Sequence, residues 1–485
     1  MKIRYPATLK RTVRNRKLWL ASILALVIVA SYANSLPGAF HYDDYALFLE
    51  NPEIREEALN PSSLLALHAG RPLALLSLEL EYRLFGENPL GFHLVSLLLH
   101  ISAALVLFHV ISHCSPSLLT SFLAAALFAL HPIQAQAVNY IWSRSVLLAA
   151  FFLLLSVLAS RTGKNSWPAA LLFQLAVWSR MDALAAFPAL LLLNRKRQMP
   201  VIAVGVFNLA ASLYSLISAG NTEIAWNHPA PGKFLIAAPL NLLRYLKLVF
   251  HPEGYSIFHA YPEPETAALI ASYAVIALIL WAVILLREKA PLISAGTAWM
   301  LLMLLPSVLI PNADPVNESR VYAAFAGGSL AIASLLILFG RSISEKVHSF
   351  SSLSGKKIPA ASLKILLPLA CLPFLALKTI ERNTIWNDDV GIWKEAVSLN
   401  QASHLPVYNL GIALARQGEF TAGSKVLLRA IKLNPADDMS YSAAGYCFFM
   451  SGRTRKAKEY YTRALELNPG NTSAREALEH LENQE

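Results

Sequence analysis

Eleven runs of apolar residues, most of them long enough to cross a lipid bilayer as a helix, occupy most of the first 380 residues of this chain. About twenty apolar residues span the hydrocarbon core, and fewer suffice when the ends of a helix reach toward the headgroups. The runs lie near residues 18–37, 92–112, 117–131, 145–160, 167–180, 182–194, 200–219, 266–286, 291–310, 321–340 and 361–380. They predict an all-α, polytopic membrane bundle of about eleven spans.

The composition supports the same class. Hydrophobic residues make up 55% of the 485 residues and charged residues only 15%, whereas charged residues are about a quarter of an ordinary soluble protein. The net charge of +10 does not indicate nucleic-acid binding, because seven basic residues and no acidic one lie within positions 1–17. The three cysteines are scattered and predict neither a disulfide framework nor a metal site.

Basic residues between the spans predict which side of the membrane each loop occupies. Cytoplasmic loops carry an excess of lysine and arginine, so the basic block at 1–17 places the N-terminus in the cytoplasm ahead of a retained first span. Residues 234–250 are ambiguous, because polar and basic residues interrupt them. If they are interfacial or re-entrant, the basic loops at 287–289 and 341–357 become cytoplasmic. The C-terminal region then lies outside.

The first loop, residues 39–92, is predicted to lie on that same outer side. It carries nine acidic and three basic residues. Within it Leu73, Leu76, Leu80 and Leu84 recur at helical spacing, with charged residues between them. This pattern is typical of a helix lying on the membrane surface, so we expect the loop to be structured.

From about residue 385 onward the chain becomes polar and shows a period of 34 residues. The recurring residues are Ala396, Ala430 and Ala464, then Asn400, Asn434 and Asn468, and the pairs Gly411/Gly445, Gly418/Gly452 and Pro435/Pro469. This is the period of tetratricopeptide repeats, which have two helices per repeat. We therefore predict a linker and half-repeat at 381–403, and two repeats with a capping helix at 404–485, following the membrane domain at 18–380.

Two adjacent carboxylates, Asp43 and Asp44, follow the first span at the start of the outer loop. Ionisable groups beside a bilayer are costly to maintain without a partner, so they indicate chemistry. A second interpretation is structural, because an aspartate can cap a helix by accepting backbone N–H bonds. A later pair, Asp388 and Asp389, stands where the repeat region begins and is interpreted as a solvated helix start.

Further polar residues stand at the ends of the apolar runs or within them. All except His100 are predicted at or near the outer face, where arginines could bind an anionic lipid headgroup. The alternative is that the histidines are packing residues and that the arginines reach toward the membrane surface or pair with Asp182 and Glu318. The candidates are His93, His100, His131, Arg144, Arg180, Arg320 and Tyr322. No Walker loop, dinucleotide-binding glycine pattern or His-Glu-x-x-His motif is present in the sequence.

The ordered series of motifs resembles the transmembrane and tetratricopeptide-repeat O-mannosyltransferases and their bacterial relatives, which belong to the GT-C class of membrane glycosyltransferases. The series is Tyr42-Asp43-Asp44, Asn51-Pro52, Arg71-Pro72-Leu73, Gly91-Phe92-His93-Leu94-Val95 with His100, Leu130-His131-Pro132, Ile141-Trp142-Ser143-Arg144, and Glu318, Arg320 and Tyr322. The chain departs from the family pattern at Ser319, which separates Glu318 from Arg320. It matches the Ser-Lys-Glu pattern only loosely at Ser179-Arg180-Met181-Asp182.

The resemblance implies transfer of a sugar from a polyprenyl-phosphate carrier to a protein hydroxyl or a cell-surface glycan on the outer face of the membrane. Asp43 or Asp44 would be the base, and the other would orient the acceptor or a divalent cation such as Mg²⁺ or Mn²⁺. The remaining candidates would bind substrate, with Arg71, Arg144, Arg180 and Arg320 at the phosphate. Two repeats are few for a eukaryotic member, so we expect a bacterial inner-membrane protein with periplasmic repeats that recruit the acceptor.

Two other classes of function remain open at this point. A non-catalytic membrane scaffold for envelope or glycan assembly would use the repeats and the spans, but would not need an acidic pair and outer-facing arginines. A secondary transporter would show an internal duplication of its spans, and none is visible in the sequence.

The predicted sidedness can be tested with reporter fusions. A reporter that is active only outside the cytoplasm should be active after Glu485 and inactive near Ser351, because the basic loops hold residues 341–357 inside. Activity measurements in intact cells, with the reverse-acting reporter at both positions as the control, check this. The opposite pattern would show that residues 234–250 cross the membrane.

Overall fold

The computed structural model describes residues 7–45, 49–50, 71–115, 117–162, 165–193, 199–218, 231–260, 263–311, 314–354, 365–366 and 368–483. The chain divides into two compact units. The membrane unit comprises Met1–Tyr255 and Glu263–Thr384, and the repeat unit comprises Ser256–Pro262 and Ile385–Glu485. Within the described residues there are helices and no β-strand, which confirms the all-α prediction.

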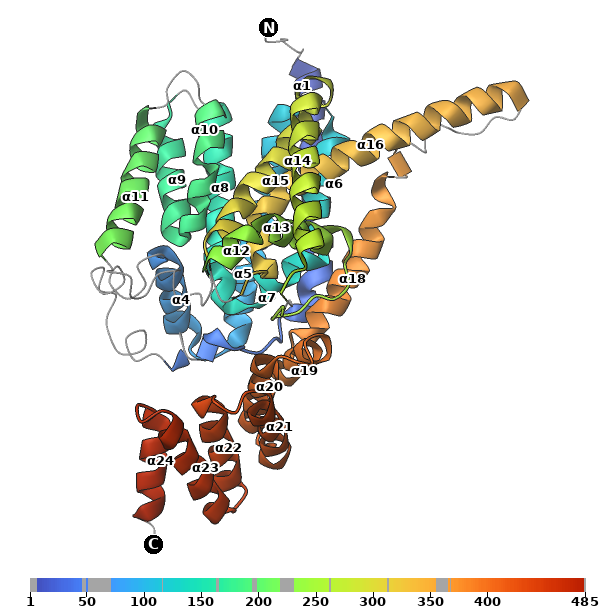
Figure 1. The fold of residues 1–485 in the computed structure, drawn as a ribbon. Helices are drawn as coiled ribbons and strands as arrows, with labels where there is room; N and C mark the ends of the chain where they lie inside the picture. Colours follow the sequence, from blue (N-terminus) through green and yellow to red (C-terminus); the bar gives the residue numbers. More distant parts are fainter. Residues whose placement is uncertain are drawn as a thin grey trace. The chain divides into compact units, whose positions relative to one another are not determined.

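The membrane unit is built from helices of very different lengths (Figure 1). Its α-helices are α1 (Ala7–Tyr32), α4 (Pro72–Phe85), α5 (Pro89–Cys114), α6 (Leu118–Leu130), α7 (Ala135–Asn139), α8 (Arg144–Thr162), α9 (Trp167–Ser179), α10 (Phe187–Leu193), α11 (Met199–Ser218), α12 (Pro231–Ile236), α13 (Ala238–Phe250), α14 (Thr266–Lys289), α15 (Pro291–Leu309), α16 (Val321–Ser354) and α18 (Cys371–Ile385). Its short 3₁₀ turns include η1 (Ala33–Ser35), η3 (Pro132–Gln134), η4 (Ile141–Ser143), η5 (Met181–Ala186) and η6 (Glu318–Arg320).

Within the described residues, six helices are long and apolar enough to cross a membrane, and a seventh span arises if α6 and the bent segment after it are counted together. The six are contained in α1, η4 with α8, α5, α14, α15 and η6 with α16. Three shorter apolar helices correspond to the predicted runs at 167–180, 182–194 and 200–219. The run at 361–380 and the loop at 39–92 lie partly outside the described residues. The chain is therefore a multi-pass membrane protein, and the count of eleven spans stays a prediction.

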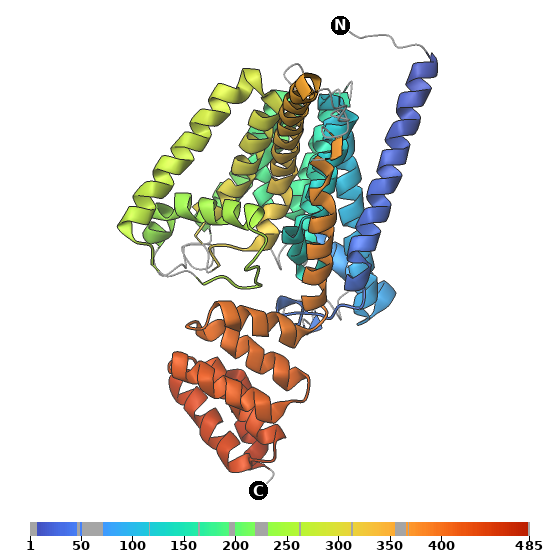
Figure 2. The same ribbon diagram turned by 90° about the vertical axis from the view of Figure 1, so that its right-hand side faces the viewer.

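The ambiguous segment at 234–250 forms the end of α12 and all of α13. In Figure 2, α13 runs across the direction of α14 and α15, and it packs against both. It buries an apolar stripe that includes Leu242 and Leu248, while Lys247 is exposed. A short helix with one apolar and one polar side is typical of an interfacial position. This geometry supports the proposed interfacial placement.

Two glycines allow α15 and α16 to approach closely. A Cβ atom at Gly296 would lie 2.5 Å from the carbonyl oxygen of Gly327, and a Cβ atom at Gly327 would lie 2.5 Å from that of Gly296. Small residues at such contacts let membrane helices pack backbone to backbone. This contact helps to hold α16, and with it η6, in place against the bundle.

The surface helix predicted in the first loop is α4, but its charged residues do not all face outward. Leu80 and Leu84 are 44% and 74% exposed, whereas Glu79 and Glu81 are each only 4% exposed. Arg83 pairs with Glu79 at 2.7 Å along the helix surface. The leucine spacing therefore predicts the helix but not the buried position of its carboxylates.

Glu81 is buried because α8 presents a cation to it. Arg144, which begins α8, is fully buried and forms an ion pair with Glu81. The same guanidinium donates hydrogen bonds to the Phe92 carbonyl oxygen at 2.9 Å and to Ser96 Oγ at 3.1 Å. Since these partners lie on α4 and α5, Arg144 joins three helices of the membrane unit.

The repeat unit contains six helices within its described residues. They are α19 (Asp389–Leu399), α20 (His404–Arg416), α21 (Phe420–Leu433), α22 (Asp438–Met450), α23 (Thr454–Leu467) and α24 (Thr472–Glu482). The 34-residue period has a structural cause at each position. The three alanines are fully buried, the three asparagines are the C-cap residues of α19, α21 and α23, and Gly418 and Gly452 have φ values of +82° and +73° between helices. Glycine favours that conformation because it lacks a Cβ atom.

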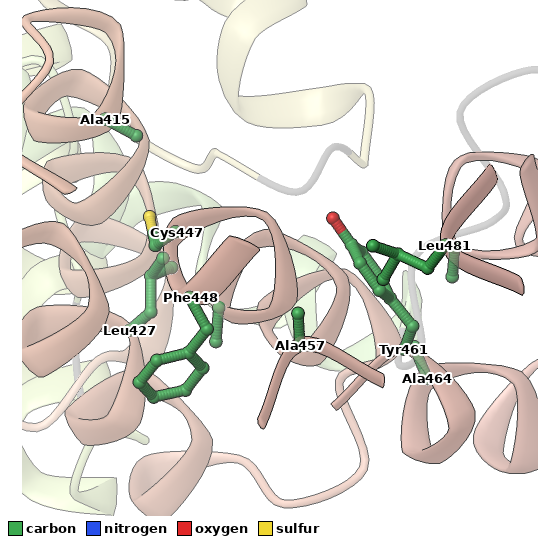
Figure 3. Close-up of a cluster of buried hydrophobic side chains, with 10 residues drawn as sticks. Ala415, Leu427, Cys447, Phe448, Ala457, Tyr461, Ala464 and Leu481 are labelled. Atoms are coloured by element: carbon green, nitrogen blue, oxygen red, sulfur yellow. The ribbon is translucent and has the colours of Figure 1, made fainter. Parts of the chain in front are cut away.

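The other glycine pair marks where paired helices touch. A Cβ atom at Gly411 would lie 2.5 Å from Leu427, and one at Gly445 would lie 2.9 Å from Tyr461. Leu427 and Tyr461 belong to the buried hydrophobic cluster shown in Figure 3. The cluster is continuous through both repeats, as expected for a stacked solenoid.

The repeat unit also holds a segment from elsewhere in the chain. Asn400 donates through Nδ2 to the Phe258 carbonyl oxygen at 3.0 Å, and its Oδ1 accepts the Ala260 N–H at 2.7 Å. One side-chain amide thereby satisfies two backbone groups of a non-helical segment. This interaction explains why residues 256–262 belong to this unit.

The Arg144–Glu81 pair gives a direct test of the packing around α4. Changing Glu81 to Leu leaves a buried guanidinium without its carboxylate and should lower stability by about 3–5 kcal/mol. The double variant Glu81→Leu with Arg144→Met should recover much of that loss, because no lone charge remains. Thermal unfolding of the purified protein in nanodiscs measures both.

The matched control is Glu79→Leu, whose partner Arg83 is 46% exposed. The loss there should be no more than about 1 kcal/mol, since a partly exposed pair contributes little. Equal losses for the two single variants would contradict the structural role assigned to Arg144.

Candidate active site

The two aspartates that follow the first span have different environments. Asp44 is fully buried, and both of its carboxylate oxygens accept backbone N–H bonds. Oδ2 accepts from His41 at 2.9 Å, and Oδ1 accepts from Trp142 at 2.7 Å. In the bond to His41, an acidic side chain accepts the backbone N–H of the residue three positions earlier. The same bond forms one half of the capping-box motif at helix starts. Asp44 thus accepts backbone N–H bonds, as the structural alternative has it, but from His41 and Trp142 and not from the N–H groups that an N-cap residue would accept.

Asp43 is only half-buried. Its backbone N–H donates to the Tyr140 hydroxyl at 3.2 Å. Burial raises the pKa of the Asp43 carboxyl above its ordinary value, while a hydrogen bond from Tyr140 and the charge of Arg71 oppose that change. A carboxylate with a raised pKa that is still reachable can take a proton from a substrate near neutral pH.

The backbone is strained immediately before the pair. Tyr42 has a φ of +44°, and no other non-glycine residue among those described has a positive φ. This conformation is unfavourable for a residue with a side chain, and it occurs mostly where a site requires it. The strained Tyr42 stands between His41, which is buried, and Asp43, which is half-buried.

Three of the predicted arginines come together although they are far apart in the sequence. Arg71 precedes α4, Arg180 follows α9 and Arg320 ends η6. Burial, followed by the positive charge of Arg180, lowers the pKa of Arg71 to about 10, and Arg320 acts in the same direction. The charges of Asp182 and Asp43 act in the opposite direction, so Arg71 lies among both cations and carboxylates.

Acidic and polar neighbours hold these arginines. Arg180 Nε donates to Asp182 Oδ2 at 2.7 Å. Arg320 Nη1 donates to the Asp314 carbonyl oxygen at 3.2 Å, and the Tyr245 hydroxyl is hydrogen-bonded to Arg320. Asp182 therefore partners an arginine, as the structural interpretation proposed. The cluster as a whole brings three arginines near the carboxylates of Asp43, Asp182 and Asp314.

A pocket of about 30 Å³ lies beside this cluster, with a polar and an apolar side. Arg180, Asp182 and Arg320 form its polar part. Its other walls come mainly from α8, α15 and α16 and are largely apolar. They consist of Val146, Ala149, Leu153, Ala183, Met303, Ser307 and Ala323. The pocket therefore places guanidinium groups next to hydrocarbon-like side chains.

The structure does not bring Arg144 into this cluster. Its guanidinium is fully buried among Glu81, Phe92 and Ser96, as described above. Because these protein partners occupy it, we leave Arg144 out of the proposed substrate site.

The three histidines and Tyr322 are also interior residues. His100 Nε2 faces the Ala129 carbonyl oxygen at 3.1 Å and must carry the proton, so Nδ1 accepts from the Tyr322 hydroxyl at 2.8 Å. His131 Nε2 likewise donates to the Val249 carbonyl oxygen at 3.0 Å, and its Nδ1 accepts the Ile133 N–H at 3.3 Å. These geometries favour the packing interpretation for His100, His131 and Tyr322.

His93 is buried against the first loop. Its Nε2 lies so near Gly38 that a Cβ atom there would be 2.7 Å away. His93 thus supports the segment that leads to Asp43 and has no place in the arginine cluster.

Sequence reasoning missed several residues that the structure places at or around the site. Tyr140 stands just before the Trp142-Ser143-Arg144 motif, and Asp314 stands in a short polar loop between two spans. Both positions carry a weak signal, a polar residue at the end of an apolar run. Arg382 and Glu318 form a buried pair at 3.8 Å, and nothing in the spacing predicts that pairing.

The pKa of Asp44 provides a test of its environment. Burial raises it from 3.8 to about 7, against the lowering effect of the two N–H bonds. Between these values the folded protein binds more protons than the unfolded chain, so the contribution to stability is largest at low pH and is lost as pH rises through about 7.

The stability of the wild type relative to Asp44→Asn should therefore decrease from about pH 5 to about pH 8. Thermal unfolding in nanodiscs at both values measures this difference. Because the wild type and Asp44→Asn share every other titrating group, the contributions of those groups cancel in the difference between the two proteins. A difference that grows with pH would show that the folded protein favours the ionised form.

Comparison with known proteins supports the resemblance that the motifs indicated. Residues 439–471 match the family model of the tetratricopeptide repeat. The chain is 30% identical to protein O-mannosyl-transferase TMTC4 of Homo sapiens over 168 residues, which cover 29% of this chain and 22% of the relative. It is 23% identical to a protein O-mannosyl-transferase of Caenorhabditis elegans over 450 residues, covering 85% of this chain and 62% of the relative.

A third relative, protein O-mannosyl-transferase TMTC3 of Mus musculus, is 22% identical over 508 aligned positions, covering 86% of this chain and 51% of the relative. The chain thus spans between about a fifth and three fifths of the length of these curated relatives. Its homologues are TMTC-type protein O-mannosyl-transferases, as the ordered motifs predicted, and the chain itself contains a tetratricopeptide repeat.

Proposed function

We propose that this chain is an integral-membrane glycosyltransferase of the GT-C class, similar to O-mannosyltransferases. It moves a sugar from a polyprenyl-phosphate carrier to a hydroxyl of a protein or surface glycan on the outer face of the membrane. The homologues are protein O-mannosyl-transferases, which supports the reaction class. The observation that carries the proposal is the reachable carboxylate of Asp43 beside three clustered arginines.

Asp43 is the proposed general base. Its carboxylate takes the proton of the acceptor hydroxyl while that oxygen bonds to the anomeric carbon of the sugar. The bond from the anomeric carbon to the phosphate oxygen breaks, and its electron pair leaves with the lipid phosphate. Burial raises the pKa of Asp43, which makes it a stronger base than a solvated aspartate.

Asp44 is assigned a positioning role. Its oxygens are engaged by the N–H groups of His41 and Trp142, so it ties the first loop to η4. Tyr140, directly before η4, contacts Asp43. Asp44 therefore holds together the two segments that carry Asp43 and its hydrogen-bond partner.

Arg71, Arg180 and Arg320 are the proposed phosphate ligands. Guanidinium groups bind phosphate oxygens through paired hydrogen bonds, and they stabilise the charge that grows as the lipid phosphate departs. Apolar side chains of α8, α15 and α16 lie beside two of these arginines at the adjacent pocket. Asp182 orients Arg180 through their 2.7 Å contact.

The residues around the base do not fit the divalent cation that the sequence left open. No group of three or more His, Cys, Asp and Glu side chains in the described part of the chain could hold a metal ion. Both oxygens of Asp44 accept N–H bonds, and Arg71 is the charged neighbour of Asp43. We therefore derive no step through a metal.

We also propose that the protein resides in a bacterial inner membrane, with the N-terminus cytoplasmic and the repeat unit periplasmic. The distribution of basic loops supports this orientation. Repeat solenoids present extended binding surfaces, so the repeat unit is the proposed recruiter of the acceptor. The chemical groups named above all belong to the membrane unit.

Substitution of Asp43 tests the proposal. Asp43→Asn keeps the size of the side chain but removes the base, so turnover should fall by about two to four orders of magnitude while donor binding survives. Arg320→Ala should instead weaken donor binding by a few kcal/mol, because it removes a charge-assisted contact. A purified, reconstituted and donor-saturated transfer assay separates the two effects.

Asp388→Asn is the matched control, since this aspartate belongs to the second acidic pair, caps α19 by accepting the N–H groups of Val390 and Gly391, and otherwise accepts a hydrogen bond from Gln417 Nε2 within the repeat unit. It should leave turnover unchanged. Near-normal transfer by Asp43→Asn would overturn its assignment as the base. No transfer by the wild type in the same assay would favour the alternative of a non-catalytic tetratricopeptide-repeat membrane scaffold.

A further inference from the structure

The reaction proposed above does not use the buried carboxylate of Glu318. This residue is fully buried and forms an ion pair with Arg382 of α18, with 3.8 Å between Nη2 and Oε2. Arg382 is itself 5% exposed and lies 5.8 Å from the ring centroid of Tyr255. Burying two charges is costly, so such a pair indicates a specific structural or functional requirement.

Glu318 belongs to the same short turn as the proposed phosphate ligand Arg320. The turn η6 consists of Glu318, Ser319 and Arg320. With about three residues per turn, side chains two positions apart point in different directions. Glu318 accordingly meets Arg382, whereas Arg320 meets Asp314 and Tyr245. The short turn therefore links the contact made by Glu318 to the contacts made by Arg320.

Hydrogen bonds also hold the middle residue of η6, Ser319. The Ser319 N–H donates to Gln136 Oε1 and to Asn317 Oδ1, both at 3.1 Å. These bonds fix the middle of the turn. The ion pair with Arg382 holds Glu318, the first residue of the turn. Because the turn has only three residues, this contact also limits how far the backbone at Arg320 can rotate.

Arg382 can act as a fixed point because α18 is tied to other helices by buried hydrogen bonds. Asn383 Nδ2 donates to the Ser31 carbonyl oxygen at 2.9 Å, and Asn383 Oδ1 accepts from Asn139 Nδ2 at 2.8 Å. Thr379 Oγ1 donates to the Leu130 carbonyl oxygen at 2.8 Å. These partners lie on α1, on α7 and at the end of α6. The helix that carries Arg382 is therefore held in place by hydrogen bonds to three other helices.

We infer that Arg382 is a positioning residue for the donor site, which holds Glu318 so that η6 presents Arg320 to the phosphate of the lipid carrier. The inference rests on the proposed function, because it assigns Arg382 to the placement of a phosphate ligand. Arg382 does not contact the donor in this scheme. Its loss should change donor affinity and leave acceptor recognition unaffected.

The test measures binding of farnesyl-phosphate mannose to the full-length protein in nanodiscs, together with the KM for the acceptor. Arg382→Met should raise the donor Kd by about 10- to 100-fold, the scale on which small misplacements of binding groups act. The acceptor KM should not change. Glu318→Gln should have a similar effect, and the two changes together should not add, because each removes the same interaction.

The double variant Glu318→Gln with Arg382→Met keeps the test decisive if Arg382→Met fails to fold, since it leaves no lone buried charge. It should still bind the donor weakly. Arg416→Met is the matched control, because Arg416 lies 3.9 Å from Asp389 in the repeat unit, far in sequence from η6. It should leave the donor Kd unchanged. Wild-type donor affinity in the double variant would overturn the inference.

Failure of the inference and failure of the proposed function give different results. If Arg320→Ala weakens donor binding and the double variant does not, the donor site stands and Arg382 has no part in it. If Arg320→Ala and Asp43→Asn both leave binding and transfer unchanged, the proposed donor site and base are wrong, and if the wild type neither binds the donor nor transfers the sugar, the proposed function itself fails. Equal changes in donor Kd and acceptor KM for Arg382→Met would indicate a general structural role and would also overturn the inference.

Discussion

The cost of burying charge is the constraint on which the membrane unit depends. A guanidinium or carboxylate removed from water must find a partner of opposite charge and further hydrogen bonds. Arg144 meets this requirement with Glu81 and two acceptors on α5, and Arg382 meets it with Glu318 beside Tyr255. These pairs connect α4, α5, α8, α18 and η6. They also decide which arginines are committed to the fold.

The arginine cluster obeys the same constraint in a different way. Arg71, Arg180 and Arg320 lie among the carboxylates of Asp43, Asp182 and Asp314, so each cation has an anionic neighbour. Arg180 and Arg320 also line a small pocket whose other walls are largely apolar. The phosphate of the proposed donor would add a further anion beside these guanidinium groups.

Two acidic pairs in one chain show how the same dipeptide can serve different ends. In the repeat unit, Asp388 caps α19 and Asp389 approaches Arg416 at 3.9 Å, so both are explained by local structure. In the first loop, only Asp44 is used in that manner, by the N–H groups of His41 and Trp142. Asp43 remains half-buried, next to a strained Tyr42 and a tyrosine hydroxyl. The contrast assigns the two members of this pair separate roles.

The sequence by itself determined those features that arise from local or periodic physics. Apolar runs identified the membrane class, and the 34-residue period identified the repeats, because buried alanines, capping asparagines and left-handed glycines must recur wherever the same helix pair is built. It could not distinguish Arg144 from Arg180, or Asp43 from Asp44, since each has the same chemistry and a similar position at the end of an apolar run. Only the tertiary structure decided these, because burial and pairing depend on segments that are 63 to 98 residues away along the chain, such as Glu81 for Arg144 and Trp142 for Asp44.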